Sequence, residues 1–113
     1  MSREKTYFVP EIPDSVARMV RTICSDYERR ERAIKYSNIT GTVLERYIEL
    51  NAAIDGALQV IEVGIRDDIF RDIASGRGYT RSCAQCLVSK NAYYRRRRKL
   101  IYDIARRLAL IPE

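Results

Sequence analysis

Two cysteines in this sequence have a spacing that could do chemistry. Cys83 and Cys86 form a C-x-x-C pair, which is typical of structural zinc sites and of redox proteins. A zinc site needs about four ligands, and the chain has no histidine and only one other cysteine, Cys24. A redox pair is expected beside a strand and a helix, and no strand pattern appears. We therefore interpret the pair as core residues and expect no metal and no cofactor.

Three carboxylates, Asp67, Asp68 and Asp72, are also close together in the sequence. Paired carboxylates can serve as a general acid and a general base. No nucleophile, partner base or phosphate-binding loop accompanies them, so a catalytic site is not indicated. We interpret them as surface charges and predict that the protein is not an enzyme.

The third group is a run of five cations from Arg95 to Lys99. It belongs to a segment, Ile73 to Tyr102, that holds eight of the 21 Lys and Arg residues and none of the 15 Asp and Glu residues. The net charge of +6 therefore arises in this segment. Five consecutive cations on a helix point around its whole circumference, so some of them need an anionic partner. We predict that this anion is the phosphate of duplex DNA; a solvated helix face, RNA and anionic lipid are the alternatives.

The elements that would position these residues are helical. A chain of 113 residues with 46% hydrophobic and 32% charged residues has the size and composition of one soluble domain. We predict an all-α fold, a small helical bundle that ends in a helix-turn-helix with a long basic recognition helix. Residues 1–13 are expected to be a flexible arm, 14–75 a helical scaffold and 76–113 the helix-turn-helix. No stretch reaches the roughly 20 apolar residues that span a bilayer, so we expect no membrane contact.

Periodicity and capping signals place scaffold helices at about 14–36, 42–63 and 65–75. Asp14 is the expected N-cap of the first, and Thr42 with Glu45 would form a capping box for the second. Gly64 weakens a helix by about 1 kcal/mol relative to alanine, so we place a break there between two nearly collinear helices. The apolar stripe of this region consists of Val43, Tyr47, Leu50, Ile54, Ala57 or Leu58, Ile61, Ile65, Ile69 and Ile73. The stripe is first of all core, and a homodimer through this long helix is a second use for it.

The C-terminal segment has the layout of a helix-turn-helix. Residues 79–86 can form a short helix, residues 87–89 a tight turn, and Ser89 the N-cap of a helix over 89–109. The face of the short helix that we expect to be buried carries Tyr79, Cys83 and Cys86; a frame shifted by one residue would bury Ala84 and Leu87. Of the two adjacent tyrosines, we assign Tyr93 to the core and Tyr94 to the groove or the DNA backbone.

The second helix would insert its N-terminal part into the major groove. The residues predicted to read bases are Ser89, Lys90, Asn91, Tyr94, Arg95 and Arg98. The residues predicted to hold phosphates are Arg77, Arg81, Arg96, Arg97 and Lys99. Asn91 would read adenine, and Arg95 or Arg98 would read guanine, by bidentate hydrogen bonds.

The C-terminal residues resemble the promoter-reading C-terminal domain of bacterial sigma factors. They resemble more closely the RinA/ArpU-type late-gene transcription regulators of phages of Gram-positive bacteria. The resemblance covers about residues 65–110, and its matching positions are Ile73, Gly76, Tyr79, Cys83, Cys86, Val88-Ser89 and the run from Ala92 to Leu100. The chain departs from the pattern at Ser82 and Cys86, where aliphatic residues are usual, and at Arg97, where sigma factors bury a leucine. The resemblance implies a sequence-specific regulator encoded by a phage or prophage, working in the bacterial host cytoplasm with host RNA polymerase as a partner.

Two other functions stay open at this stage. One is the DNA-recognition small subunit of a phage packaging terminase, which also joins a helix-turn-helix to oligomerising helices. A ring of about eight or more subunits would favour packaging, and a monomer or dimer would favour regulation. The other is an RNA-binding or protein-binding adaptor, which competition between duplex DNA and single-stranded RNA would reveal.

Overall fold

The computed structural model describes residues 9–79 and 88–112, and these are helical with no strand among them. The helices in this part of the chain are α1 (Asp14–Ser25), α2 (Tyr27–Tyr36), α3 (Gly41–Leu58), α4 (Val63–Ser75) and α5 (Lys90–Arg107). The predicted all-α class is confirmed. The short helix expected over 79–86, with both of its frames, lies outside the described residues apart from Tyr79.

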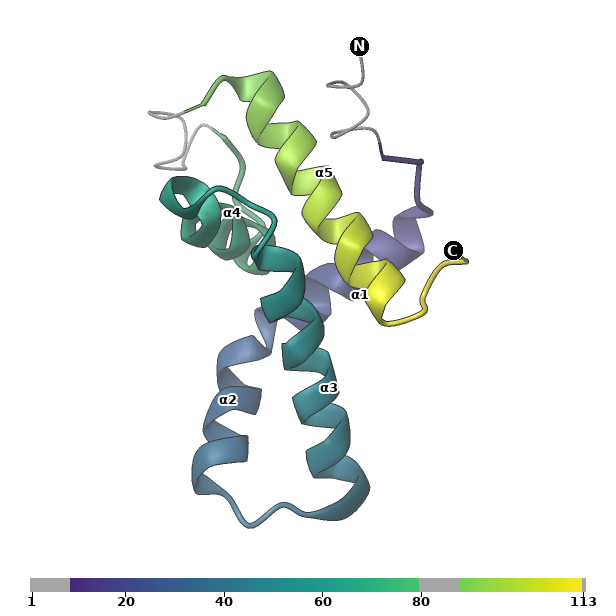
Figure 1. Ribbon diagram of the computed structural model, residues 1–113, viewed down its shortest axis with the longest axis vertical. Coiled ribbons are helices and arrows are strands. Elements are labelled where there is room, and N and C mark those ends of the chain that lie inside the picture. The colour runs from purple at the N-terminus through teal and green to yellow at the C-terminus, as the bar shows by residue number, and fades with distance from the viewer. Residues whose placement is uncertain (1–8, 80–87, 113) are drawn as a thin grey trace.

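The helices form a body and a projecting hairpin (Figure 1). α1, α4, α5 and the C-terminal part of α3 pack together, whereas α2 and the N-terminal part of α3 extend away from them as an antiparallel pair. Side chains at the centre of the body are aliphatic and almost fully buried, and they include Ile54, Ile61, Ile65, Ile69, Ile73, Leu100 and Ile104. Burial of one such side chain contributes about 1.5–3 kcal/mol. The later part of the predicted apolar stripe is therefore core.

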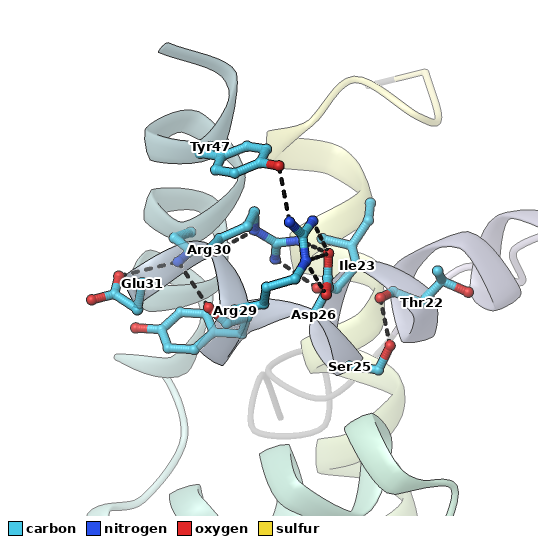
Figure 2. Close-up of polar contacts among 10 residues, drawn as sticks. Thr22, Ile23, Ser25, Asp26, Arg29, Arg30, Glu31 and Tyr47 are labelled. Carbon is cyan, nitrogen blue, oxygen red and sulfur yellow. Dashed lines mark hydrogen bonds and ion pairs between the residues drawn. The ribbon is translucent and has the colours of Figure 1, made fainter. Parts of the chain in front are cut away.

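The single helix predicted over 14–36 is wrong, because the chain bends at Asp26. This residue has φ −104° and ψ 9°, and it separates α1 from α2. The Arg30 guanidinium donates to the Ile23 carbonyl at the end of α1 (2.6 Å) and to Asn51 Oδ1 of α3 (2.6 Å). Figure 2 shows Arg30 next to Ile23 and Asp26. Arg30 is 3% exposed and needs acceptors at that depth, and the bend brings one of them within reach.

Two predicted N-caps are also wrong. Asp14 is the first residue of α1 and makes no capping hydrogen bond, although its charge lies in the first turn, where the helix dipole favours a carboxylate. α3 begins at Gly41, one residue before the expected cap, and it too lacks a side-chain cap. Gly41 has φ +64°, which glycine adopts without the steric cost of a Cβ. The helix therefore starts before Thr42 and Glu45 can form a capping box.

The break expected at Gly64 lies earlier, at residues 59–62, and Gly64 is in the first turn of α4. The chain turns at this corner, so α3 and α4 are not collinear (Figure 1). Ile61 enters the core there at 3% exposure, and Arg66 donates to its carbonyl (2.9 Å). A glycine costs little in the first turn of a helix, so Gly64 does not determine where the chain turns. The burial of Ile61 sets the position of the corner instead.

The described part of the expected arm, residues 9–13, lies against the body. Val9 is 9% exposed, and Ile12 packs against the core. The Val9 carbonyl accepts a hydrogen bond from Arg98 of α5 (3.4 Å), and a pocket of about 350 Å³ lies between this segment, α1 and α5. Residues 9–13 are thus part of the packed structure, unlike the loosely held arm that we expected.

Candidate nucleic-acid interface

The helix predicted over 89–109 is present as α5, which is slightly shorter. Ser89 is its N-cap, as predicted: Ser89 Oγ accepts a hydrogen bond from the Ala92 amide (3.1 Å). The Ser89 carbonyl accepts from the Tyr93 amide (2.8 Å), which is the first helical hydrogen bond. This cap defines where α5 begins, and with it the direction in which each later side chain points.

We expect Ser89→Ala to lower the free energy of unfolding by about 1 kcal/mol, because the Ala92 amide loses its side-chain acceptor. Ser89→Asp should retain the stability of the wild-type protein, since a carboxylate caps as well and suits the helix dipole. Urea denaturation followed by circular dichroism measures both. Equal losses in the two variants would show that Ser89 stabilises the protein by something other than capping.

The six residues predicted to read bases lie on one exposed surface. Ser89, Lys90, Asn91, Tyr94, Arg95 and Arg98 are all solvent-exposed, and we call this surface the α5 outer face. Asn91, Arg95 and Arg98 follow one another at intervals of three and four residues, so they line one side of the helix. The opposite side carries Tyr93 and Leu100, both fully buried. The prediction that Tyr93 enters the core is therefore confirmed. In Figure 1 the first turns of α5 lie at the end of the molecule away from the tip of the α2–α3 hairpin.

Three of the cations predicted to hold phosphates are paired with carboxylates, and two of these, Arg96 and Lys99, lie on α5. Arg96 donates to both oxygens of Glu62 through Nε (2.7 Å) and Nη2 (2.6 Å), and its side chain is only 11% exposed. The hydrogen bond from Arg96 lowers the pKa of the Glu62 carboxyl below its ordinary value. Lys99 Nζ lies 3.2 Å from Asp103 Oδ2. A DNA phosphate would have to displace these carboxylates to bind either cation. Arg81, another of the predicted phosphate-holding residues, lies outside the described residues.

Arg77 and Arg97, which were also predicted to hold phosphates, belong to a buried polar cluster around Asp72. Asp72 is 0% exposed, so the prediction that it is a surface charge is wrong. The Tyr93 hydroxyl donates to Asp72 Oδ2 (2.6 Å), and Arg77 Nη2 forms an ion pair with Oδ1 (3.0 Å). Arg97 donates to the Arg77 carbonyl (2.7 Å) and to the Tyr93 hydroxyl (3.3 Å). Burial, and next the bond to Asp72, raise the pKa of Tyr93 to about 12, so its hydroxyl remains a donor.

The burial of Asp72 had a signal in the sequence. It follows Ile69 by three residues and precedes Ile73, so it lies on the apolar stripe of α4 rather than on its polar side. The ion pair with Arg77 does not satisfy every polar atom, because Asp72 Oδ1 and Arg77 Nε have no hydrogen-bond partner in the described structure. The cluster therefore ties the end of α4 and the following loop to α5 through a charge pair and one strong hydrogen bond.

Three tyrosines attach the loop to the start of α5. Tyr94 Oη accepts from the Tyr79 amide (3.2 Å), and the Tyr79 hydroxyl donates to the Val88 carbonyl (3.0 Å). The rings of Tyr79 and Tyr93 meet edge to face at 5.3 Å, and those of Tyr93 and Tyr94 at 4.9 Å. Tyr94 is thus only 37% exposed and has a structural contact beside its predicted role in the groove. The sequence did not predict this cluster, because Tyr79 and Tyr94 are 15 residues apart and no local pattern connects them.

Arg98 has a more acidic setting than the rest of the α5 outer face. It lines the pocket next to residues 9–13, together with Glu11, Asp14 and Arg21. Two carboxylates in the same pocket compete with a phosphate or a base edge for a cation. Asn91 and Arg95, one to two turns earlier, are not among the residues that line this pocket.

In the part of the chain that the structure describes, no three metal-ligating side chains are grouped closely enough to hold an ion; Cys83 and Cys86 lie outside it. Cys24 is a core residue, and burial raises the pKa of its thiol to about 12. None of the described helices combines the length and the apolar character needed to cross a bilayer. The fold and the site define an all-α protein with a capped cationic helix at one end and a helical hairpin at the other. Comparison of the chain with models of protein families, with curated proteins and with solved structures gave no match.

Proposed function

We propose that this protein binds double-stranded DNA through the α5 outer face and regulates transcription. The observation that carries the proposal is that all six residues predicted to read bases share one exposed surface of a single capped helix. A helix of this kind fits the major groove, where amide and guanidinium side chains can bond to base edges.

The charge distribution supports the same proposal. Residues 73–102 contain no acidic side chain, and the net charge of +6 arises within them. Glu62 and Asp103 pair with Arg96 and Lys99, whereas the exposed cations Lys90, Arg95 and Arg98 all lie on the outer face. Such a surface attracts a polyanion, and its polar groups then select among sequences. The resemblance to RinA/ArpU-type regulators supports transcription as the process that the binding serves.

We expect the logarithm of the DNA affinity to fall with the logarithm of salt concentration with a slope near −3. Each neutralised phosphate contributes about −0.9 to this slope, and the outer face offers three cations, Lys90, Arg95 and Arg98. A slope near −5 would correspond to about six phosphates, and would show that cations such as Arg96 and Lys99 exchange their carboxylates for DNA. Fluorescence anisotropy on a labelled duplex at several salt concentrations measures the slope, and a value near zero would contradict the proposal.

The target sequence can be obtained by selecting bound duplexes from a random pool. The enriched duplex then serves in competition with a scrambled duplex and with single-stranded RNA of the same length. We expect the enriched duplex to compete best. If single-stranded RNA competes more strongly than every duplex, the protein is an RNA-binding protein and the proposal fails.

A further inference from the structure

The outer part of the α2–α3 hairpin has no core of its own. Within residues 31–50 no side chain is buried, although the segment is rich in apolar residues. The larger of these are Ile34, Tyr36, Ile39, Val43, Leu44, Tyr47, Ile48 and Leu50. Helices of 10 and 18 residues gain most of their stability from packing an apolar face. In the outer half of the hairpin α2 and α3 pack against each other without fully burying any of these side chains.

One face of α3 shows this most clearly. Val43, Tyr47, Leu50, Ile54 and Ala57 are spaced by four, three, four and three residues, so they form one continuous stripe along the helix. At the body end of the stripe, Ile54 and Ala57 are 0% exposed. At the hairpin end, Tyr47 and Leu50 are half-buried and Val43 is 51% exposed. The core-forming face therefore continues beyond the body and is left uncovered there.

The two helices of the hairpin carry opposite net charge. Within residues 31–50, α2 has two cations and one carboxylate, a net charge of +1, whereas α3 has one cation and two carboxylates, a net charge of −1. A second hairpin therefore offers this one both an apolar face and a complementary pattern of charge. No other partner chemistry is needed to explain the two features together.

We propose that the hairpins of two copies of this chain pack face to face into an antiparallel four-helix bundle. The two-fold axis runs parallel to the helices, because that rotation places α2 of each copy opposite α3 of the other. An axis across the hairpins would instead bring α2 against α2 and α3 against α3, which joins like charges. The electrostatics thus select one of the two arrangements, and every neighbouring pair of helices in it is antiparallel.

A network of polar contacts at its base holds the hairpin in a defined direction. Arg30 links α1 to Asn51 of α3, as described above, and Asn51 Nδ2 donates to Glu31 of α2 (3.1 Å). Arg29 donates to Asp26 (2.8 Å) and to the Tyr47 hydroxyl (3.1 Å), and Figure 2 shows its guanidinium between the two. A surface fixed in this way before association loses less conformational entropy when it binds.

The arrangement places both bodies at the same end of the bundle. If the proposed DNA binding is correct, two α5 helices related by a two-fold axis would read an inverted repeat. That consequence rests on the proposed function, whereas the dimer itself does not. The mass of the protein in the absence of DNA therefore tests the dimer separately.

The first test is light scattering coupled to size-exclusion chromatography. We expect the wild-type chain to have twice its monomer mass of 13.2 kDa and Val43→Lys to shift to 13.2 kDa. Ile48→Lys is the matched control, because Ile48 is 48% exposed on the same helix but lies off the stripe, and it should stay dimeric. Circular dichroism should show the same helix content in all three proteins. A wild-type monomer at the highest soluble concentration, or equal dissociation by both variants, would overturn the proposal.

The second test distinguishes the two arrangements by joining the hairpin tips. Asn38 is exposed in the short connection between α2 and α3, so the two Asn38 residues lie close together only when the axis runs along the hairpins. We expect Asn38→Cys to be cross-linked into a covalent dimer by a short bis-maleimide, at a rate well above that of the wild-type protein with its native cysteines. A dimer that is cross-linked no faster than the wild type would overturn the parallel axis.

Discussion

Replacing Asn91 and Arg95 together with alanine should lower the affinity for the selected duplex by at least about 30-fold. Each bidentate contact to a base is worth about 1–3 kcal/mol, and 1.4 kcal/mol is a factor of ten in affinity. Both residues are exposed in the first two turns of α5, so their removal leaves the core and the Ser89 cap intact. Anisotropy titrations of the wild-type protein and the variant, at one salt concentration, measure the change.

The matched control is Arg106→Ala. Arg106 is exposed on the same helix and carries the same charge, but it lies in the last turn, far from the outer face. We expect it to reduce affinity less than about 3-fold, because it removes only long-range attraction. The double variant should also lose preference for the selected duplex over a scrambled one. If it weakens binding to both duplexes equally, Asn91 and Arg95 do not read sequence and their assigned roles are wrong.

Arg30→Ala should lower the free energy of unfolding by about 3 kcal/mol. This is the largest loss of stability that we expect from removing one polar side chain of this protein. The substitution removes a side chain that is 3% exposed and leaves Asn51 Oδ1 and the Ile23 carbonyl without their donor. Burial lowers the pKa of the Arg30 guanidinium, and the Asp26 carboxylate, 3.9 Å away, opposes this effect. The buried cation is therefore stabilised by its polar partners. Chemical denaturation measures the loss.

Arg32→Ala is the control for Arg30→Ala, because Arg32 is exposed on the same helix and its removal should change stability by less than about 0.5 kcal/mol. A double-mutant cycle between Arg30→Ala and Asn51→Ala should show coupling of about 1 kcal/mol or more, since the two side chains bond directly. Additive losses would mean that Arg30 stabilises the protein by packing alone. A loss below about 1 kcal/mol for Arg30→Ala would contradict its role in the bend.

Local signals in the sequence were enough to predict the helical class, the end of α4 and the beginning of α5. Gly76 ends α4 in the left-handed conformation (φ +80°), and Ser89 caps α5, because each effect depends on residues within one helical turn. The periodicity that placed Tyr93 and Ile54 in the core is equally local. The same helical periodicity predicted which residues of α5 lie on its outer face.

Tertiary packing decided the features that we predicted wrongly from the sequence. The bend at Asp26 serves Arg30, whose acceptor Asn51 is 21 residues away, and the corner between α3 and α4 follows the burial of Ile61. Periodicity alone cannot place either one, because a helical pattern reports which face is apolar and not where the chain must turn to bury it. The same limit applies to the stripe on α3. Periodicity does not show that the body covers Ile54 and Ala57 but leaves Val43 exposed.

The partners of the cations were also decided by the tertiary structure alone. Arg96 meets Glu62 from 34 residues away, and Tyr93 meets Asp72 from 21 residues away. The sequence determined that the positive charge of this protein lies in one acid-free segment beginning at residue 73. Packing then determined which cations are neutralised and which remain on the outer face, because electrostatic partners are chosen by distance in space, and helix packing brings together residues that no local pattern connects.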